Sequence, residues 1–599
     1  MTEQEEQLQI RIRELEKEVA RLHSQIKEQR YGLTWLDVPE AFETDSENKI
    51  PILEEVKDKA IDNGGDCPPH ILIEGDNYHA LTCLNYTHRG KIDVIYIDPP
   101  YNTGNDGFTY KDKRILKEFP DGSPVPKEHP LRHSYWLSFM SKRLELAKNL
   151  LSDKGVIFIS IDDNEQANLK LLCDKVFGEE NFIVDFIWRG GRRNMSKWVS
   201  TSHEYMLAYA KNLAICNLLS VEWNEKKQGL LEIYQIASRF VKETNKDYEK
   251  ASLLLKNWFK DLPDSNASKD HSHYCWIDEQ GVYFASDISR GGGGGPKWNI
   301  KNPFTGNYVK TPLRGWAYST IEELNDDIKK GVIHINGDVV PCKKRHLKDN
   351  ETQILESVFY KDRRGSSKRL RDLMGNDVFP FPKDEIVLAD KIKSFGEQSS
   401  IILDFFAGSG TTMHATMKLN AEDGGHRQCI LVQQKEGDNN ICENVTYERN
   451  KRVMCGYTNA KGEQVEGLGG KMKYYKTAFV GKNQSKNATD ADRIELAQKA
   501  GCLLALGENT LEEVSKSDDY QIYTSGGKYT AIFFTEHYIK LPEFVAEVEK
   551  LQQANAEIVV YIFSWGTPEI FENEFDNLRG ITLKAIPQPI LDVYKSLNR

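Results

Sequence analysis

The sequence predicts an α/β protein built around a mostly parallel, doubly wound sheet. Seven short apolar runs, each typical of a buried strand, alternate with segments of helical spacing; they lie at about residues 71–74, 92–97, 155–161, 182–188, 205–210, 401–405 and 429–433. The alternation stops between residues 220 and 375, which indicates an inserted domain. Two of the runs end in loops that carry acids, aromatics or glycines, at the edge of such a sheet where ligands bind.

The composition is that of a globular protein with several domains, since 39% of the 599 residues are hydrophobic and 28% are charged. No apolar run reaches the length of a membrane span, and the charged N-terminus does not match a secretory signal. We therefore expect a cytoplasmic protein whose 10 cysteines are reduced thiols. The net charge of −11 does not favour a nucleic-acid partner. A local basic surface could nevertheless bind phosphates.

The N-terminal residues 1–30 have apolar side chains at alternating spacings of 4 and 3, from Leu8 to Ile26. This spacing is that of a coiled-coil seam over about three heptads. Two interpretations stay open: a coiled coil that dimerises or binds a partner, and one amphipathic helix packed on its own domain. Residues 31–69 are expected to be a linker with short helices.

The first part of the core, residues 70–219, contains the stretch that we expect to hold a substrate. Its apolar run 92–97 ends in Asp98-Pro-Pro-Tyr101. Proline has no N–H to donate to a neighbouring strand, so the strand must end there. Asp98 and Tyr101 are therefore presented on a stiff loop at the carboxyl end of a strand. Residues 103–130, rich in glycine, proline and charge, are expected to be a long surface segment.

The second part of the core, residues 376–480, resumes the alternation after the expected insert. Its strand 401–405 turns into a helix through Asp404-Phe-Phe-Ala-Gly-Ser-Gly410. Gly408 and Gly410 permit a tight turn and close approach of a ligand to the backbone. The pattern lacks the third glycine of the dinucleotide fingerprint and the Gly-Lys-Ser/Thr of a P-loop. Alone, it indicates either a ligand loop or a plain turn. Residues 481–599 are expected to form a small C-terminal α/β domain.

The two loops together resemble those of the amino-group DNA methyltransferases that use S-adenosyl-L-methionine. In that family a Phe-x-Gly-x-Gly loop wraps the methionine end of the cofactor, and an Asp-Pro-Pro-Tyr loop holds the target base. Phe406–Gly410 and Asp98–Tyr101 match both patterns, and their order in the chain resembles the β class. Asn302–Gly306, Pro312–Trp316 and Gly469–Tyr475 further resemble the modification (Mod) subunit of type III restriction-modification systems.

The resemblance implies a seven-stranded Rossmann-like methyltransferase core and adenine-N6 methylation of double-stranded DNA by base flipping, without a metal. The catalytic residues would be Asp98, Pro99, Pro100 and Tyr101. Asp76 would contact the cofactor's adenine and Glu436 its ribose, although a helix cap and a solvated loop acid are the alternatives. The full expected cofactor set is Asp76, Asp98, Phe379, Pro380, Lys383, Asp404, Phe405, Phe406, Gly408, Gly410, Thr411 and Glu436.

The insert at residues 220–375 would then be the target-recognition domain. Its basic side chains are expected to contact DNA phosphates, with a solvated face as the alternative; they are Lys343, Lys344, Arg345, Arg363, Arg364, Lys368 and Arg369. The expected partners are double-stranded DNA, a second copy of the chain and a restriction subunit with helicase and nuclease activity. Three other functions stay open: cytosine-N4 methylation, RNA methylation, and a non-catalytic DNA-recognition subunit of a nuclease or helicase complex.

Overall fold

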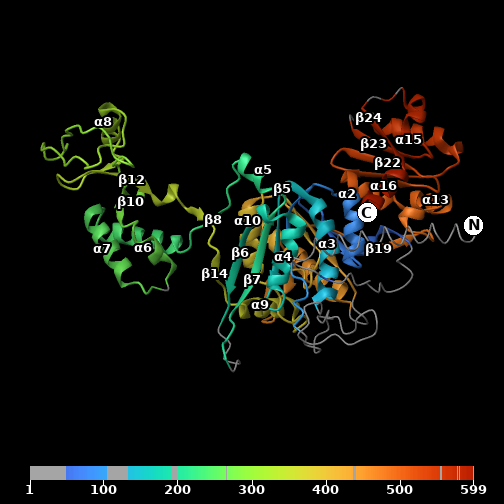
Figure 1. Cartoon of the computed structure of the whole chain (residues 1–599), viewed down its shortest axis with the longest axis horizontal. Coiled ribbons are helices and arrows are strands. Elements are labelled where there is room, and N and C mark those ends of the chain that lie inside the picture. Colours follow the sequence, from blue (N-terminus) through green and yellow to red (C-terminus); the bar gives the residue numbers. More distant parts are fainter. Residues whose placement is uncertain are drawn as a thin grey trace, which may run out of the picture. The chain divides into compact units, whose positions relative to one another are not determined.

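The computed structural model describes residues 35, 49–65, 67–103, 133–191, 198–264, 266–435, 440–552, 556–576, 578 and 580–597. The chain divides into two compact units (Figure 1). One comprises Met1–Val221 and Glu356–Arg599, and the other comprises Glu222–Leu355. The expected coiled coil at 1–30 lies outside the described residues, as does the expected surface segment at 103–130 apart from Thr103.

The first unit is built on an 11-stranded sheet with the order β1-β19-β3-β16-β15-β4-β5-β7-β6-β14, in which β2 also pairs with β19. The seven expected strands lie in this sheet as β3 (His70–Glu74), β4 (Ile92–Ile97), β5 (Leu151–Ile161), β6 (Phe182–Arg189), β7 (His203–Ala210), β15 (Ile401–Asp404) and β16 (Gln428–Gln433). Four more strands enlarge it: β1 (Ile50–Glu55), β2 (Ile61–Asn63), β14 (Val358–Tyr360) and β19 (Gly470–Val480).

The expectation of a linker at residues 31–69 is wrong for β1 and β2. β1 pairs antiparallel with β19, from Ile50 opposite Val480 to Glu55 opposite Tyr475. Ile50, Ile52 and Leu53 are fully buried. The apolar side chains of β1 therefore join the core of the first unit, through a partner strand more than 400 residues further along the chain.

The centre of the sheet brings two loops to the same edge. β4 pairs in parallel with both β15 and β5, and Val94 lies opposite Ile402. Because parallel strands end at the same edge, the loops that follow Ile97 and Asp404 leave the sheet as neighbours. β7 runs antiparallel to both β5 and β6. The central strands are buried on both faces, as expected for a parallel sheet covered by helices.

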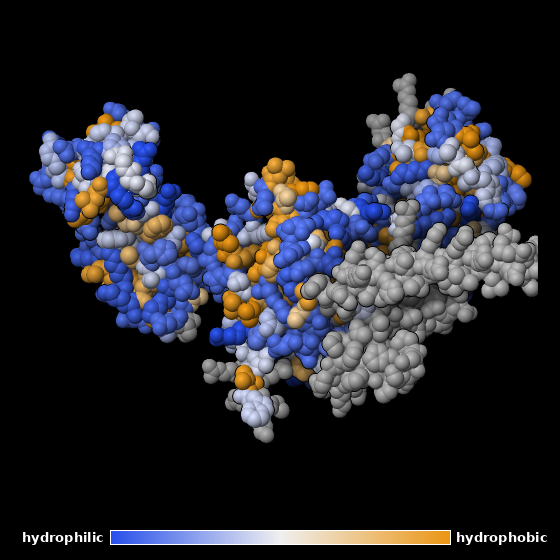
Figure 2. Space-filling model, in the orientation of Figure 1, coloured by the Kyte–Doolittle hydropathy of each residue, from blue (hydrophilic) through white to orange (hydrophobic). Residues whose placement is uncertain are grey.

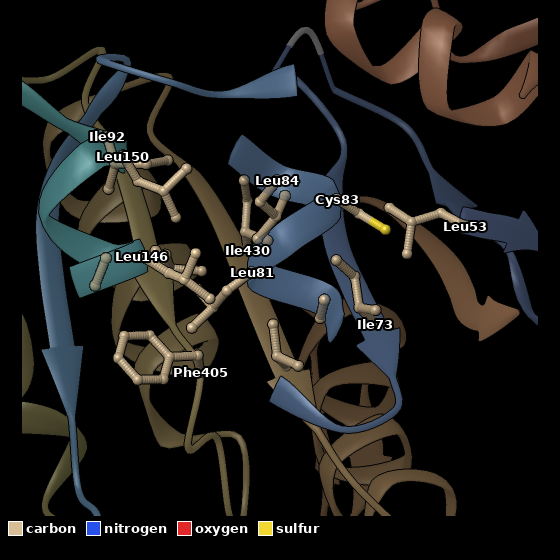
Figure 3. Packing of buried hydrophobic residues seen from close by; sticks show 14 of the residues in the cluster. Leu53, Ile73, Leu81, Cys83, Leu84, Ile92, Leu146, Leu150, Phe405 and Ile430 are labelled. Carbon is tan, nitrogen blue, oxygen red and sulfur yellow. The ribbon is translucent and has the colours of Figure 1, made fainter. Parts of the chain in front are cut away.

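The helices of the first unit cover this sheet. α2, α3 and α4 pack side by side, and α10 packs against α11. Leu81 and Leu84 of α2 pack near Leu146 and Leu150 of α3 in the hydrophobic core (Figure 3). The bounds are α2 (Asn77–Thr87), α3 (Ser134–Leu150), α4 (Gln166–Phe177), α5 (Leu213–Leu218), α9 (Arg364–Met374), α10 (Glu385–Phe395), α11 (Thr411–Asp423) and α12 (Glu448–Cys455). A short ribbon follows α12, with β17 (Tyr457–Thr458) and β18 (Gln464–Val465).

The C-terminal part of the first unit has its own five-stranded sheet, in the order β20-β21-β22-β23-β24. α14 and α16 pack against α2, so this part shares the hydrophobic core of the large sheet. The strands are β20 (Glu512–Lys516), β21 (Tyr520–Ser525), β22 (Lys528–Phe533), β23 (Glu557–Phe563) and β24 (Ile581–Ile586). The helices are α13 (Asp490–Lys499), α14 (Gly501–Glu508), α15 (Leu541–Gln552) and α16 (Gln588–Leu597).

The second unit has two small hydrophobic cores, one under α6 (Leu230–Glu243) and α7 (Tyr248–Asp261) and one around Trp316 beside α8 (Ile321–Lys329). Its four-stranded sheet has the order β11-β12-β10-β9, and a two-stranded ribbon pairs β8 with β13. The strand bounds are β8 (Asn224–Lys226), β9 (Trp276–Asp278), β10 (Gly281–Asp287), β11 (Ile333–His334), β12 (Cys342–His346) and β13 (Thr352–Ile354).

The second unit is shorter than the expected insert at 220–375. It ends at Leu355, and residues 356–375 belong to the first unit. The reason is that β14 extends the large sheet by pairing in parallel with β6, with Tyr360 opposite Arg189. Hydrophilic residues predominate on the faces of both units seen in Figure 2. Within the described part of the chain, no helix is both long enough and apolar enough to cross a membrane.

Candidate active site

An open cavity of about 1050 Å³ lies at the carboxyl ends of β4 and β15. The loop after β4 contributes Asp98, Pro99, Pro100 and Tyr101 to its lining. The loop after β15 contributes Phe406, Gly408 and Ser409, and the first residues of α11 line it as well. The two loops that the sequence singled out therefore line one space, although about 300 residues separate them.

A side chain of α3 and the residues just before α3 and α4 fix the loop after β4. Trp136 Nε1 donates to the carbonyl oxygen of Pro100 at 2.7 Å. Asn102 has a φ of +60° and is buried. Its side-chain amide donates to Glu165 Oε1 at 2.6 Å, and His133 Nδ1 lies at the same distance from that oxygen. Proline backbones, a buried tryptophan and a buried carboxylate thus leave this loop little freedom.

A polar network surrounds the Asp98 carboxylate, whose side chain is 29% exposed. Tyr101 Oη donates to Asp98 Oδ1 at 2.8 Å. Lys383 Nζ donates to Tyr101 Oη at 2.6 Å and lies 3.2 Å from Asp98 Oδ1. Glu204 of β7 accepts from Lys383 at 3.1 and 3.2 Å and from Arg363 Nη1 at 2.8 Å. Two cations and two carboxylates balance one another in this network.

The buried charges shift one another's proton affinities. Burial raises the pKa of the Asp98 carboxyl, and the Lys383 ammonium limits the rise. Burial acts to lower the pKa of Lys383, but Asp98 and Glu204 outweigh it, so the net shift is upward. Burial, with the neighbouring carboxylates, also raises the pKa of Tyr101 well above its ordinary value. Lys383 is therefore a cation, and Tyr101 a neutral hydrogen-bond donor, near neutral pH.

The glycine loop after β15 is held by hydrogen bonds at both ends. Asp404 accepts from the backbone N–H of Phe406 at 3.0 Å and from Thr412 Oγ1 at 2.6 Å. Burial raises the pKa of Asp404 to about 7. The N–H of Gly408 donates to Gln433 Oε1 at 2.7 Å, and Gly408 and Gly410 have φ values of +51° and +75°. Side chains rarely adopt such backbone angles, so the loop depends on both glycines.

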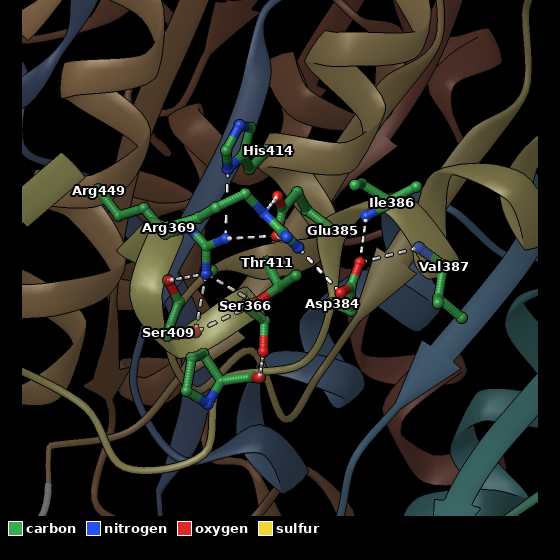
Figure 4. A network of polar contacts seen from close by, with 12 residues as sticks. Ser366, Arg369, Asp384, Glu385, Ile386, Val387, Ser409, Thr411, His414 and Arg449 are labelled. Carbon is green, nitrogen blue, oxygen red and sulfur yellow. Dashed lines mark hydrogen bonds and ion pairs between the residues drawn. The ribbon is translucent and has the colours of Figure 1, made fainter. Parts of the chain in front are cut away.

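A second polar network lies against this loop (Figure 4). Arg449 Nη1 donates to Ser409 Oγ at 2.9 Å and to Thr411 Oγ1 at 2.7 Å. Arg369 of α9 lies beside it and forms ion pairs with Asp384, at 2.9 Å, and with Glu385. Burial lowers the pKa of Arg449 to about 10, which leaves it charged near neutral pH. The glycine loop is therefore held by a buried cation that donates to two of its hydroxyl groups.

Most of the expected cofactor residues lie in the cavity. Four are not among the lining residues. Gly410 ends the glycine loop next to the lining residues Ser409 and Thr411 but does not line the cavity itself. Phe405 is 1% exposed and packs in the core below the loop (Figure 3). Asp76 does not line this cavity, and its carboxylate caps α2 by accepting from the N–H of Tyr78 at 2.8 Å. Glu436 lies outside the described residues. The expected residues that do line the cavity are Asp98, Phe379, Pro380, Lys383, Asp404, Phe406, Gly408 and Thr411.

The basic residues expected in the insert divide between the two units. Arg363, Arg364 and Lys368 line the cavity in the first unit. In the second unit, Lys343 is 2.9 Å from Asp327 and Lys344 is 2.9 Å from Asp278. Arg345 is exposed on β12. These residues therefore do not form one basic surface of the insert.

Sequence reasoning missed Glu204, Arg449 and Gln433, which the structure places around the two loops. A signal for Glu204 was present, because it is an acid next to an otherwise apolar strand run, Tyr205–Ala210. Arg449 and Gln433 carry no such local signal. Their roles arise from contacts between distant segments of the chain.

Comparison with known proteins gives matches over most of the chain. The model of the family described as DNA methylase matches residues 92–452. The chain is 32% identical over 439 residues to the Mod subunit of the type III restriction-modification enzyme EcoP15I of Escherichia coli, covering 69% of this chain and 66% of that protein. It is 32% identical over 400 residues to the StyLTI Mod subunit of Salmonella typhimurium, covering 63% and 54%. The alignments thus span less than two thirds of both type III relatives.

A type II enzyme is also similar. The chain is 29% identical over 385 residues to the type II methyltransferase M.KpnI of Klebsiella pneumoniae, covering 60% of this chain and 79% of that protein. The similarity therefore extends beyond the type III relatives.

Replacing Thr412 by valine should destabilise the protein more at alkaline than at acidic pH. Asp404 has a raised pKa of about 7, so its ionised form, which needs the hydroxyl donor most, predominates only above that pH. We expect Thr412→Val to lower the free energy of unfolding by about 1–3 kcal/mol near pH 8.5, and by less near pH 6. Urea unfolding at both pH values measures this. The control is Thr416→Val, because the hydroxyl of Thr416 donates to a backbone carbonyl, at 2.9 Å, and not to a carboxylate. A pH-dependent loss of stability in this control would contradict our explanation.

Replacing Gly410 by alanine should distort the glycine loop. The added Cβ would lie 2.3 Å from Asn450 Nδ2, at a φ of +75°. Gly424, at the other end of α11, has a φ of +67° and nothing within 4 Å of the same position. We expect Gly424→Ala to cost about 1 kcal/mol from backbone strain alone, and Gly410→Ala to cost clearly more because of the clash. Equal unfolding midpoints in urea would show that the loop tolerates the side chain.

Proposed function

We propose, because the chain belongs to the DNA methylase family, that it is a site-specific DNA methyltransferase acting on adenine N6 of double-stranded DNA. The observation that carries this proposal is the shared cavity. Asp98–Tyr101 and the glycine loop at 406–410 meet there, so a target base and a methyl donor could be held side by side. Methylation of cytosine N4 is the nearest alternative, and sequencing that detects modified bases, on DNA from cells with and without this chain, separates the two.

The residues of the glycine-loop side fit the proposed donor, S-adenosyl-L-methionine. A Cβ on Gly408 would lie 3.2 Å from the ring of Phe379, so the absence of a side chain leaves room between the glycine loop and this ring. α11 begins at Thr411, and helix N-termini favour anionic groups such as a carboxylate. Phe379, Pro380, Phe406, Gly408 and Thr411 would hold the cofactor. The group supplies a methyl on a positively charged sulfur.

The loop after β4 fits an amino group as the acceptor. The exocyclic nitrogen of adenine is a poor nucleophile, because its lone pair is conjugated with the ring. Asp98 would accept one of its hydrogen bonds, which a carboxylate does more strongly than a neutral acceptor. The carbonyl of Pro99 would accept the other from a rigid backbone. Tyr101 would stack on the base, which must leave the duplex to reach the cavity; such stacking contributes about 1–3 kcal/mol.

The similarity to Mod subunits supports a role as the modification subunit of a type III restriction-modification system. In this proposal the chain forms a homodimer, assisted by the heptad spacing in residues 1–30, and works with a restriction subunit on DNA inside the cell. A solitary modification enzyme is the alternative, because the type II relative is aligned over 79% of its length. Co-purification with a restriction subunit encoded in the same genome would distinguish these two roles.

We assign DNA contact in the second unit to the segment 288–321 in addition to the residues expected earlier. This segment contains five basic residues and no acidic one, in a protein with a net charge of −11. All five are exposed: Arg290, Lys297, Lys301, Lys310 and Arg314. Arg314 pairs with Asp287, just as Lys343 and Lys344 each pair with an aspartate. The other four basic residues of the segment form no ion pair with a described residue. These four exposed cations are therefore better placed to neutralise phosphates than the paired lysines are.

Replacing Asp98 by alanine should abolish methyl transfer and leave cofactor binding intact. The carboxylate is the charged acceptor for the target amino group, and loss of one such preorganised group costs on the order of 10²–10³ in rate. Transfer of a tritiated methyl group to DNA measures the rate, and equilibrium dialysis with the same labelled cofactor measures binding.

Asp153→Ala is the matched control, because Asp153 is exposed on the same sheet in β5 and does not line the cavity. Loss of cofactor binding in Asp98→Ala would indicate that the carboxylate supports the fold of the site. A wild-type protein that binds the cofactor but labels no DNA would refute the proposed function.

Replacing Lys297, Lys301 and Lys310 by alanine should weaken DNA binding and make it less sensitive to salt. Each lost phosphate contact is expected to reduce the slope of log affinity against log salt by about 0.9. Fluorescence anisotropy with a labelled duplex at several salt concentrations gives both quantities. The double variant Lys343→Ala/Lys344→Ala is the comparison. A larger loss of DNA affinity in that variant would indicate that β12, and not the segment 288–321, contacts the DNA.

A further inference from the structure

We infer that Lys383 is a positioning residue of the target-base loop, held in place by Glu204, and does not bind the cofactor. The inference rests on the proposed function and deepens it. It also separates Lys383 from Phe379 and Pro380, which precede it in the same short segment and were expected to share its role.

The hydrogen bonds of Lys383 go to the target-base loop and to Glu204. Its Nζ donates to Tyr101 Oη at 2.6 Å and to both oxygens of Glu204, at 3.2 and 3.1 Å. It lies 3.2 Å from Asp98 Oδ1 and 5.1 Å from the centre of the Tyr101 ring. Three hydrogen-bond acceptors therefore use the donors of this ammonium, and its side chain is only 12% exposed.

The effect on Asp98 is to orient the carboxylate. Tyr101 and Lys383 both approach the same oxygen, Oδ1. Among the described residues, none donates to Oδ2. Two partners on one oxygen leave the other available as an acceptor for an incoming amino group, without a search over rotamers. Lys383 also opposes the rise that burial causes in the pKa of this carboxyl, and so favours its ionised form.

Glu204 fixes the ammonium in this place. Its side chain is 5% exposed and begins at the second residue of β7, a strand in the interior of the sheet. Arg363 donates to its Oε2 at 2.8 Å. Without Glu204, Lys383 would have to balance Asp98 alone, and Arg363 would lose its buried partner. The rigid strand is therefore the anchor, and the flexible lysine side chain is the part that it positions.

The backbone around Lys383 explains why neighbouring residues have different roles. Phe381 has a φ of +51°, so the chain turns sharply between Pro380 and Lys383. Asp384 then caps α10 by accepting from the N–H groups of Ile386 and Val387. The turn leaves Phe379 against the glycine loop, where Gly408 lies, while Lys383 faces Tyr101. One segment thus contributes to the two sides of the cavity.

The test is Lys383→Met, which keeps an unbranched side chain and removes the charge. We expect the affinity for tritiated S-adenosyl-L-methionine to stay within about twofold, and methyl transfer near pH 7.5 to fall on the order of a hundredfold. Because the ammonium opposes the rise in the pKa of Asp98, its loss should move the acid limb of the transfer rate to higher pH, with partial recovery of activity in alkaline buffer. Lys383→Arg should keep the acid limb of the wild type.

The matched control is Lys473→Met. Lys473 is also a partly buried lysine of the large sheet, 2.8 Å from the buried Glu55, and it does not line the cavity. It should bind the cofactor and transfer methyl groups as the wild type does. In a double-mutant cycle, Glu204→Gln and Lys383→Met should be less than additive in their effect on the rate, because the first acts through the second.

Three results would overturn the inference: a loss of cofactor affinity greater than about tenfold in Lys383→Met, an unmoved acid limb, or full additivity with Glu204→Gln. If the wild type binds the cofactor but transfers no methyl group, the proposed function fails, and the inference is judged without activity. Cofactor affinity remains one measure. The other is urea unfolding. The difference in free energy of unfolding between the wild type and Lys383→Met should shrink as the pH falls and Asp98 takes up a proton. A difference that does not change with pH would contradict the role of Lys383.

Discussion

The parallel pairing of β4 with β15 is the constraint on which the site depends. It places the carboxyl ends of two strands, 300 residues apart in sequence, side by side at one edge of the sheet. This also brings together two carboxylates, the buried Asp404 and the partly exposed Asp98, and the charge of Asp98 adds to the rise in the pKa of Asp404. The structure separates their environments: Asp404 is satisfied by a backbone N–H and a hydroxyl, whereas Asp98 has a cation beside it. One acid is therefore structural, and the other stays available to a ligand.

The cation beside Asp98 comes from a third segment, and this arrangement couples the loops through the sheet. Lys383 precedes α10, Glu204 belongs to β7, and Arg363 precedes α9. Each position is fixed by ordinary secondary structure, such as the Asp384 cap or the register of β7 with β5. The polar groups are thus held on rigid elements, which is how a protein keeps reacting groups in place without spending ligand-binding energy on ordering them.

The sequence could predict those parts of the site that depend on a few adjacent residues. Asp98–Tyr101 and Gly408–Gly410 combine a strand end with residues of restricted or unusual backbone geometry, and each follows the strand that the sequence predicts before it. The sequence predicts a linker in place of β1, because the strand that pairs with it, β19, lies more than 400 residues away. The sequence predicts a basic surface at Lys343 and Lys344, because the adjacent residues do not indicate that Asp327 and Asp278 pair with them. Charge in a sequence is visible, but its neutralisation by distant residues is not.

The β8–β13 ribbon has a consequence for how this chain can change. It pairs Asn224 with Ile354 and Lys226 with Thr352, so the second unit begins and ends at one place. Every residue that lines the cavity lies outside Glu222–Leu355. Segments whose ends lie together can be exchanged with little disturbance of the host fold. A different second unit, joined at the same ribbon, would therefore change no residue of the cavity lining.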